Sequence, residues 1–172
     1  FERRSLNVPV NYDEHPLNWD ETHRVTMNGA MMYGKGEYPH LFGFRLPDNW
    51  LLSLQWEFGS GRPYTPSEYS TGLDPNLILE NSERMPWTEV TTIRFEKYFN
   101  IGELRTIWGI TVNNVFDKKN WRGLYTETGS PVYAVHPLNP DYNPLIDRYE
   151  YDANPRNFGE GRQILFKVGV EF

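Results

Sequence analysis

Four histidines have the broadest chemistry in this chain, because imidazole can bind metals and transfer protons near neutral pH. His15, His23, His40 and His136 lie far apart and show no ligand spacing, so they predict no metal site. The sequence contains no cysteine, which excludes thiolate ligands, disulfides and cysteine nucleophiles. We expect His23 to hydrogen-bond a loop carbonyl where a strand begins, and not to act in catalysis.

Paired carboxylates are the second kind of group that could carry catalysis. Asp20 stands next to Glu21, and Asp147 precedes Glu150; a glycosidase uses two such carboxylates. Chance pairs are expected among 23 acidic residues, and the sequence does not fix their separation. The segment 34–36 (GKG) lacks the Lys-Ser/Thr step of a phosphate-binding loop. We therefore expect no catalytic residue and no cofactor. An enzyme that acts on glycans through paired acids ranks as an alternative below the two non-enzymatic interpretations given next.

A long polar segment at 117–160 gathers aromatic and charged residues that could contact a ligand by stacking and charge-assisted hydrogen bonds. The possible ligand-contacting residues are Trp121, Arg122, Tyr125, Tyr133, Tyr142, Arg148 and Tyr149. Long ordered loops also need internal packing. Packing of these tyrosines within the loop is therefore the preferred interpretation, and ligand contact is the alternative.

The composition limits both the partners and the fold. The chain has 172 residues, enough for one ordinary domain, with 23 acidic and 17 basic residues and a net charge of −6. This balance argues against nucleic acid or an anionic membrane surface as the main electrostatic partner. The sequence contains no run of about 18 apolar residues, so it predicts no transmembrane helix. Six Trp, 11 Tyr and 10 Phe beside 14 Gly and 13 Pro favour an all-β fold with long connections.

Hydrophobic alternation with a period of two predicts strands at about 25–33, 50–58, 88–99, 105–116 and 162–172, with a possible sixth at 1–5. One row of side chains along these strands is apolar, and the opposite row includes Arg94, Glu96, Lys167 and Glu171. The apolar row holds Trp50, Leu52, Leu54, Trp56 and Phe58, then Ile93, Phe95, Trp108, Ile110 and Val112, and finally Ile164, Phe166, Val168, Val170 and Phe172.

The lengths of these elements favour a transmembrane β-barrel. A tilted strand needs about 9–11 residues to cross a bilayer, and outer-membrane barrels gather short turns at one rim and long loops at the other. The turn at 100–103 is short, whereas the loops 59–86 and 117–160 are long. In such a barrel the apolar row faces lipid and the polar row faces the lumen. The alternative is a soluble extracellular β-sandwich that binds carbohydrate through aromatic loops.

The closing strand resembles the C-terminal assembly signal of bacterial outer-membrane barrels, because Ile164, Phe166, Val168, Val170 and the terminal Phe172 alternate along it. More of the chain resembles the C-terminal region of TonB-dependent outer-membrane receptors. The matching segments occur in the family's order at 19–23 (WDETH), 59–66 (GSGRPYTP), 84–86 (RMP), 94–99 (RFEKYF), 112–120 (VNNVFDKKN), 125–129 (YTETG) and 154–156 (NPR). Thr22 and Thr92 depart from this pattern, where the family often has Arg and Asp.

The resemblance implies that residues 1–172 supply about five or six strands of a larger plugged barrel in a Gram-negative outer membrane. Such receptors are not enzymes; they take up a scarce ligand such as an iron chelate, cobalamin, glycan or peptide. The implied partners are outer-membrane lipid, the rest of the barrel and its plug, the barrel-assembly machinery and, through an N-terminal part, the energy-coupling TonB protein. Taken alone, the segment is expected to form an open curved antiparallel sheet with two unpaired edges.

Overall fold

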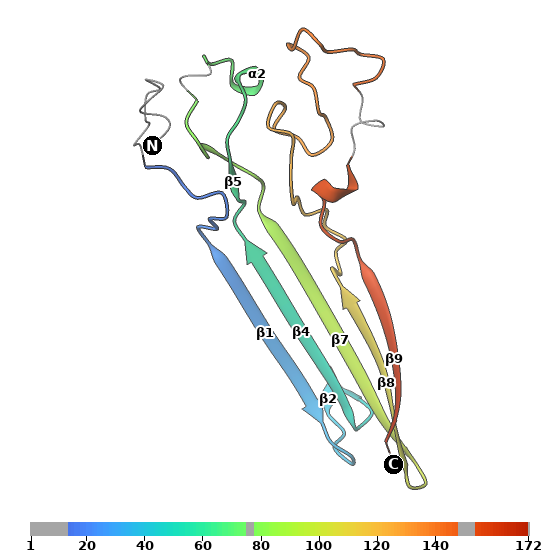
Figure 1. Ribbon diagram of the computed structural model, residues 1–172. Helices are drawn as coiled ribbons and strands as arrows, with labels where there is room; N and C mark the ends of the chain where they lie inside the picture. The colour runs from blue at the N-terminus through green and yellow to red at the C-terminus, as the bar shows by residue number, and fades with distance from the viewer. Residues whose placement is uncertain (1–13, 75–77, 148–153, 172) are drawn as a thin grey trace.

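A computed structural model describes residues 14–74, 78–147 and 154–171. Five long strands form one antiparallel sheet in which sequence neighbours are also spatial neighbours (Figure 1). They are β1 (Arg24–Tyr33), β4 (Trp50–Gly59), β7 (Thr88–Ile101), β8 (Leu104–Asn113) and β9 (Gln163–Glu171). The prediction of an all-β antiparallel sheet is confirmed, and the sheet is open. The possible strand at 1–5 lies outside the described residues.

The connections divide the molecule into two unlike ends (Figure 1). At the lower end, Ile101 pairs with Leu104 across a two-residue turn, and 34–49 contains the hairpin of β2 (His40–Leu41) and β3 (Phe44–Arg45). At the upper end, 60–87 contains β5 (Pro63–Tyr64), the short helix α2 (Glu68–Thr71) and β6 (Glu83–Arg84). The segment 114–162 joins β8 to β9 and includes the 3₁₀ turn η2 (Pro155–Asn157). The predicted grouping of long loops at one end is therefore present.

The register of the five strands places the predicted apolar row on one face of the sheet. Met31, Leu52, Phe95, Ile110 and Phe166 form one continuous cross-strand row. The next row toward the loops holds Gly29, Leu54, Ile93, Val112 and Ile164. Since successive side chains of a strand point to opposite faces, Arg94, Glu96 and Lys167 lie on the other face.

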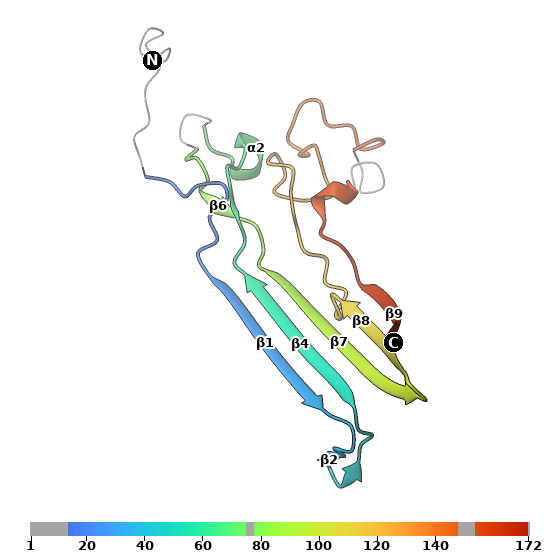
Figure 2. The same ribbon diagram turned by 60° about the horizontal axis from the view of Figure 1, so that its bottom comes forward.

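The five long strands form a single layer (Figure 2). The chain exposes 12937 Å², whereas a compact protein of 20.3 kDa exposes about 8800 Å². Phe166, which points from the apolar face, is 80% exposed. Besides the main sheet, the described part contains only the two-stranded sheets β2–β3 and β5–β6. The sandwich alternative, which requires a second sheet over the apolar face, is therefore wrong for the described residues.

Two details differ from the predicted strands. The strand expected at 105–116 ends at Asn113, because Asn114 takes a φ of 50° that no strand residue adopts. Trp50 lies on the apolar face but is only 6% exposed, since Tyr33 and Phe95 pack against its ring and its indole donates to the Pro47 carbonyl. No helix in the described part is long and apolar enough to span a membrane.

Candidate functional site

The apolar face carries aromatic clusters toward both ends of the strands. At the lower end the ring centroid of Trp50 lies 5.0 Å from that of Tyr33 and 6.1 Å from that of Phe95. At the upper end Phe58 lies 6.0 Å from Trp56 and 5.6 Å from Trp87. Between these clusters β4 carries Leu52 and Leu54, and Phe95 and Phe166 share the row of Leu52. The apolar face therefore carries a cluster of rings toward each end of its strands.

A lysine and a glutamate complete the upper aromatic cluster. The indole of Trp56 donates to Glu89 at 2.8 Å, and the ammonium of Lys118 lies 3.8 Å from the same carboxylate. The ammonium also lies 2.7 Å from the centre of the Trp87 ring. Burial lowers the pKa of Lys118, and the nearby Glu89 partly offsets this effect. Polar groups therefore enter the apolar face at its upper border.

The opposite face has a charged cluster around Glu96, which is 4% exposed. Its carboxylate accepts hydrogen bonds from Arg94 at 2.5 Å, Tyr98 at 2.8 Å and Lys167 at 3.3 Å. Gly109 lies opposite Glu96 in the register, and a Cβ there would lie 3.3 Å from the Glu96 side chain. The glycine thus leaves space for the buried carboxylate, whose charge two cations compensate.

The segments 19–23, 59–66 and 84–86, which are separate in the sequence, meet at the upper end of the sheet. Arg84 donates to Asp20 at 2.5 Å and to the Gly61 carbonyl at 3.1 Å. Arg62 lies 3.4 Å from Glu21. The hydrogen bond from Arg84 lowers the pKa of the Asp20 carboxyl. Asp20 and Glu21 are therefore each paired with an arginine of another segment, and their structural role is to hold these loops together.

Gly61 is required where these segments cross. A Cβ on this residue would lie 1.5 Å from the carbonyl oxygen of Met85, so any side chain would force the two backbones apart. The Met85 amide donates to the Arg62 carbonyl at 2.9 Å in the same crossing. The glycine of the 59–66 segment therefore permits the pairing of β5 with β6.

The segment 112–120 ties three strands together through two asparagines. Asn114, nearly buried, donates to the carbonyls of Lys118 and Glu160 at 3.0 Å each and accepts from the Lys118 amide at 3.0 Å. Asn120 accepts from the Glu89 amide at 2.9 Å and donates to the Glu89 carbonyl at 2.7 Å. These bonds hold the end of β8 beside the start of β9 and the start of β7.

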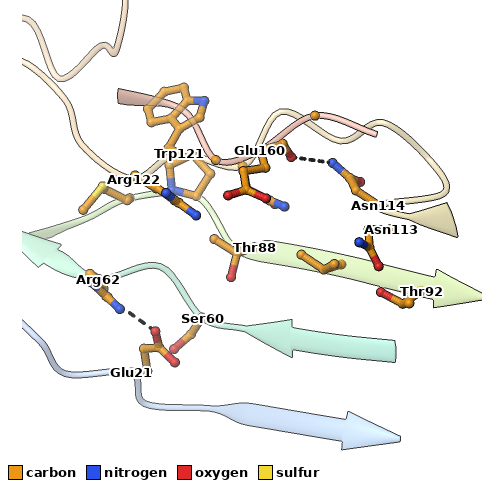
Figure 3. Close-up of a pocket in the computed structure, with 16 residues that line it drawn as sticks. Glu21, Ser60, Arg62, Thr88, Thr92, Asn113, Asn114, Trp121, Arg122 and Glu160 are labelled. Carbon is orange, nitrogen blue, oxygen red and sulfur yellow. Dashed lines mark hydrogen bonds and ion pairs between the residues drawn. The ribbon is translucent and has the colours of Figure 1, made fainter. Parts of the chain in front are cut away.

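A pocket of about 610 Å³ opens on the polar face where the strands meet the upper loops (Figure 3). Its size falls within the range of small-molecule sites. Arg62 and Glu21 border it on one side, and Arg122 and Glu160 on the other. Thr88 and Thr92 from β7 and Asn113 from β8 line its floor. Mixed charges and amides suit a polar ligand, by charge-assisted hydrogen bonds.

Of the predicted ligand-contacting residues, the structure brings Trp121 and Arg122 to this pocket. Tyr125, Tyr133 and Tyr142 do not line it; the backbone of Tyr125 forms a bridge with Ser130, and the Tyr133 carbonyl accepts a hydrogen bond from the Thr128 hydroxyl. Arg148 and Tyr149 lie outside the described residues, as do Glu150 and the terminal Phe172. The pocket residues Glu21 and Arg62 were missed, because nothing in their local sequence signals a shared cavity.

The described residues contain no cluster of three or more His, Asp or Glu side chains that could hold a metal ion. His23 contributes its backbone where β1 begins, with its amide donating to the Ser60 hydroxyl at 3.0 Å and its carbonyl accepting from the Ser60 amide at 2.8 Å. Comparisons of the chain with protein-family models, with curated proteins and with solved structures find no match.

Proposed function

We propose that this chain forms part of the wall and the outer loops of an outer-membrane β-barrel. It is then the C-terminal portion of a TonB-dependent receptor that takes up a scarce ligand. The observation that carries the proposal is the register. It assembles the alternating apolar residues of five strands into one face with no covering layer among the described residues, and leaves a charged face opposite. Such a face in water would be an association hazard.

The dimensions of the apolar face support a bilayer as its partner. Trp50 and Phe58 are eight residues apart on β4, so they are separated by about 27 Å along the strand and about 20 Å along the normal of a strand tilted by about 40°. The apolar band of a transmembrane barrel is about 25 Å tall. The aromatic clusters around these two residues then lie near the two membrane borders, where rings are favoured.

In this proposal the remaining elements have distinct parts. The polar face lines the lumen, and the upper loops and the 610 Å³ pocket face the outside, where they take part in binding a polar ligand. The outer edges of β1 and β9 pair with the rest of the barrel, and the plug and the TonB-contacting segment belong to other parts of the receptor. The chain itself carries no catalysis. The last strand, with Ile164, Phe166, Val168 and Val170, serves as signal to the barrel-assembly machinery.

Single-cysteine labelling in a background without other cysteines tests the proposal, and residues 1–172 contain no cysteine of their own. Leu54→Cys and Ile110→Cys lie on the apolar face, and their sequence neighbours Gln55→Cys and Thr111→Cys lie on the polar face. Each variant of the natural full-length protein would carry an environment-sensitive fluorophore in phospholipid vesicles. We expect nitroxide lipids to quench the first pair and aqueous iodide to quench the second.

Equal quenching of all four labels by iodide would overturn the membrane assignment and favour a water-exposed carbohydrate-binding module. Uptake is tested separately in cells that lack the energy-coupling protein. Ligand accumulation that persists in those cells contradicts the TonB-dependent part of the proposal while leaving the barrel intact. Turnover of chromogenic glycosides by the purified protein would instead support the glycan-hydrolase interpretation.

A further inference from the structure

The β2–β3 hairpin at the lower end of the sheet stands off the plane of the main strands (Figure 2). Its base is attached on the apolar side. The Trp50 indole, which points from the apolar face, donates to the Pro47 carbonyl at 2.7 Å. Lys97, opposite Trp50 in the register, donates to the Asp48 carbonyl and lies 3.5 Å from the Asp48 carboxylate. The base of the hairpin therefore lies against the face that the proposed function assigns to lipid.

The side chains at the hairpin tip are apolar and exposed. Phe42 is 91% exposed and Phe44 is 75% exposed, and Leu41 beside them is also exposed. Scattered single apolar residues are normal on a surface. Three within four consecutive residues on a projecting hairpin form a compact patch, of the kind that marks an interaction site.

The backbone at the tip is unusual for the residues it carries. His40 pairs with Arg45 and Leu41 with Phe44, so Phe42 and Gly43 form a two-residue turn with φ of 49° and 84°. Turns of this kind strongly favour Asn-Gly. The other described non-glycine residues with positive φ are Asn49, Asn81, Asn114 and Asp117. A phenylalanine held in this conformation and left exposed indicates that its ring is used for contact.

The charges around the hairpin suit lipid headgroups. The acidic residues of the connection are engaged internally: Glu37 accepts from the Gly34 amide at 2.7 Å, and Asp48 from the Gly36 amide at 2.6 Å. Arg45 at the hairpin base stacks 3.9 Å from the centre of the Tyr38 ring. An apolar tip with a cation and an aromatic ring behind it is the arrangement of interfacial membrane anchors.

We propose that residues 40–45 form an interfacial anchor that inserts Leu41, Phe42 and Phe44 among the phospholipids of the leaflet at the lower rim. This inference rests on the proposed function and goes beyond it, because the sheet alone would contact lipid only through its strands. The anchor reaches outward over the neighbouring lipids and fixes the depth at which the lower rim sits in the membrane.

The test uses Phe42→Cys in the natural full-length protein, labelled with an environment-sensitive fluorophore in phosphatidylethanolamine/phosphatidylglycerol vesicles. Glu103→Cys, in the two-residue turn at the same end of the sheet, is the matched control. We expect nitroxide lipids to quench the label at 42 several-fold more than the label at 103, with a blue-shifted emission at 42. Leu41→Cys should show the same quenching and the same blue shift as Phe42→Cys. This second variant controls for a change in hairpin structure caused by replacing Phe42.

The labels on the strands separate the possible failures. Lipid quenching at Leu54 together with iodide quenching at 42 and 41 would overturn the anchor and leave the barrel standing. A label at 42 that is shielded from both lipid and iodide would also overturn it, and would identify a protein partner at the hairpin. Iodide quenching at 54, 41 and 42 would overturn the proposed function and the anchor together.

Discussion

Leu54→Arg is the substitution that examines the membrane assignment most directly. Leu54 lies four residues from Trp50 and four from Phe58, so it is about 13 Å along the strand from each aromatic cluster, which would place it near the midplane of the proposed bilayer. Arginine at the midplane of a barrel's lipid face costs about 2–4 kcal/mol of folding free energy. If the face contacted water instead, Leu54, already 47% exposed, would lose only about 1 kcal/mol of apolar burial.

Gln55→Arg provides the matched control, because it adds the same charge one residue away on the polar face. The Gln55 amide already lies 2.5 Å from the Glu57 carboxylate, so an arginine has an acidic partner there, and we expect a change within about 0.5 kcal/mol. The measurement is the denaturant-induced unfolding free energy of the natural full-length protein in phospholipid vesicles, with heat-dependent gel mobility as a second readout. Equal losses for the two variants would refute the assignment of the faces.

Three further predictions concern the upper loops. Asn114→Ala removes three buried hydrogen bonds and should lower stability by about 2–3 kcal/mol; unchanged hydrogen exchange at the Lys118 amide would contradict this. Gly61→Ala should break the β5–β6 pairing and expose 60–87 to proteolysis, whereas Gly29→Ala, with no atom within 4 Å of the added Cβ, should not. The lowered pKa of Asp20 means that its contribution is complete above pH 3.8 and is lost as the pH falls through the folded-state pKa; Asp20→Asn should flatten that part of the acid-unfolding curve.

The strands could be predicted from the sequence because one physical property repeats along them. Alternation located β1, β4 and β9 to within a residue or two, and the register confirmed the shared face of Leu52, Phe95 and Phe166. The end of β8 was missed, since the apolar residues Val115 and Phe116 follow it in the sequence while the backbone turns at Asn114. The side-chain hydrogen bonds of Asn114 that hold this turn cannot be predicted from the hydrophobic pattern of the strand.

The candidate pocket could be predicted only in part. Trp121 and Arg122 were found because they lie in a loop rich in aromatic and charged residues. Glu21, Arg62 and Asn113 come from three other parts of the chain, and their proximity follows from the antiparallel register and from the crossing at Gly61. The β2–β3 hairpin was missed for a different reason: its strands are two residues long, too short for a period to be detected.

The amide of Asn120 has a consequence for the order in which the sheet assembles. It reproduces, on the Glu89 backbone, the donor and acceptor pair that a neighbouring strand would supply. The backbone at the first end of β7 is thereby hydrogen-bonded to a residue that follows β8, and the other end of β7 leads into the two-residue turn. The stretch 88–120 pairs β7 with β8 through contacts that are close in the sequence, which favours rapid formation. It can act as the seed from which the ribbon grows in both directions, toward β4 and toward β9.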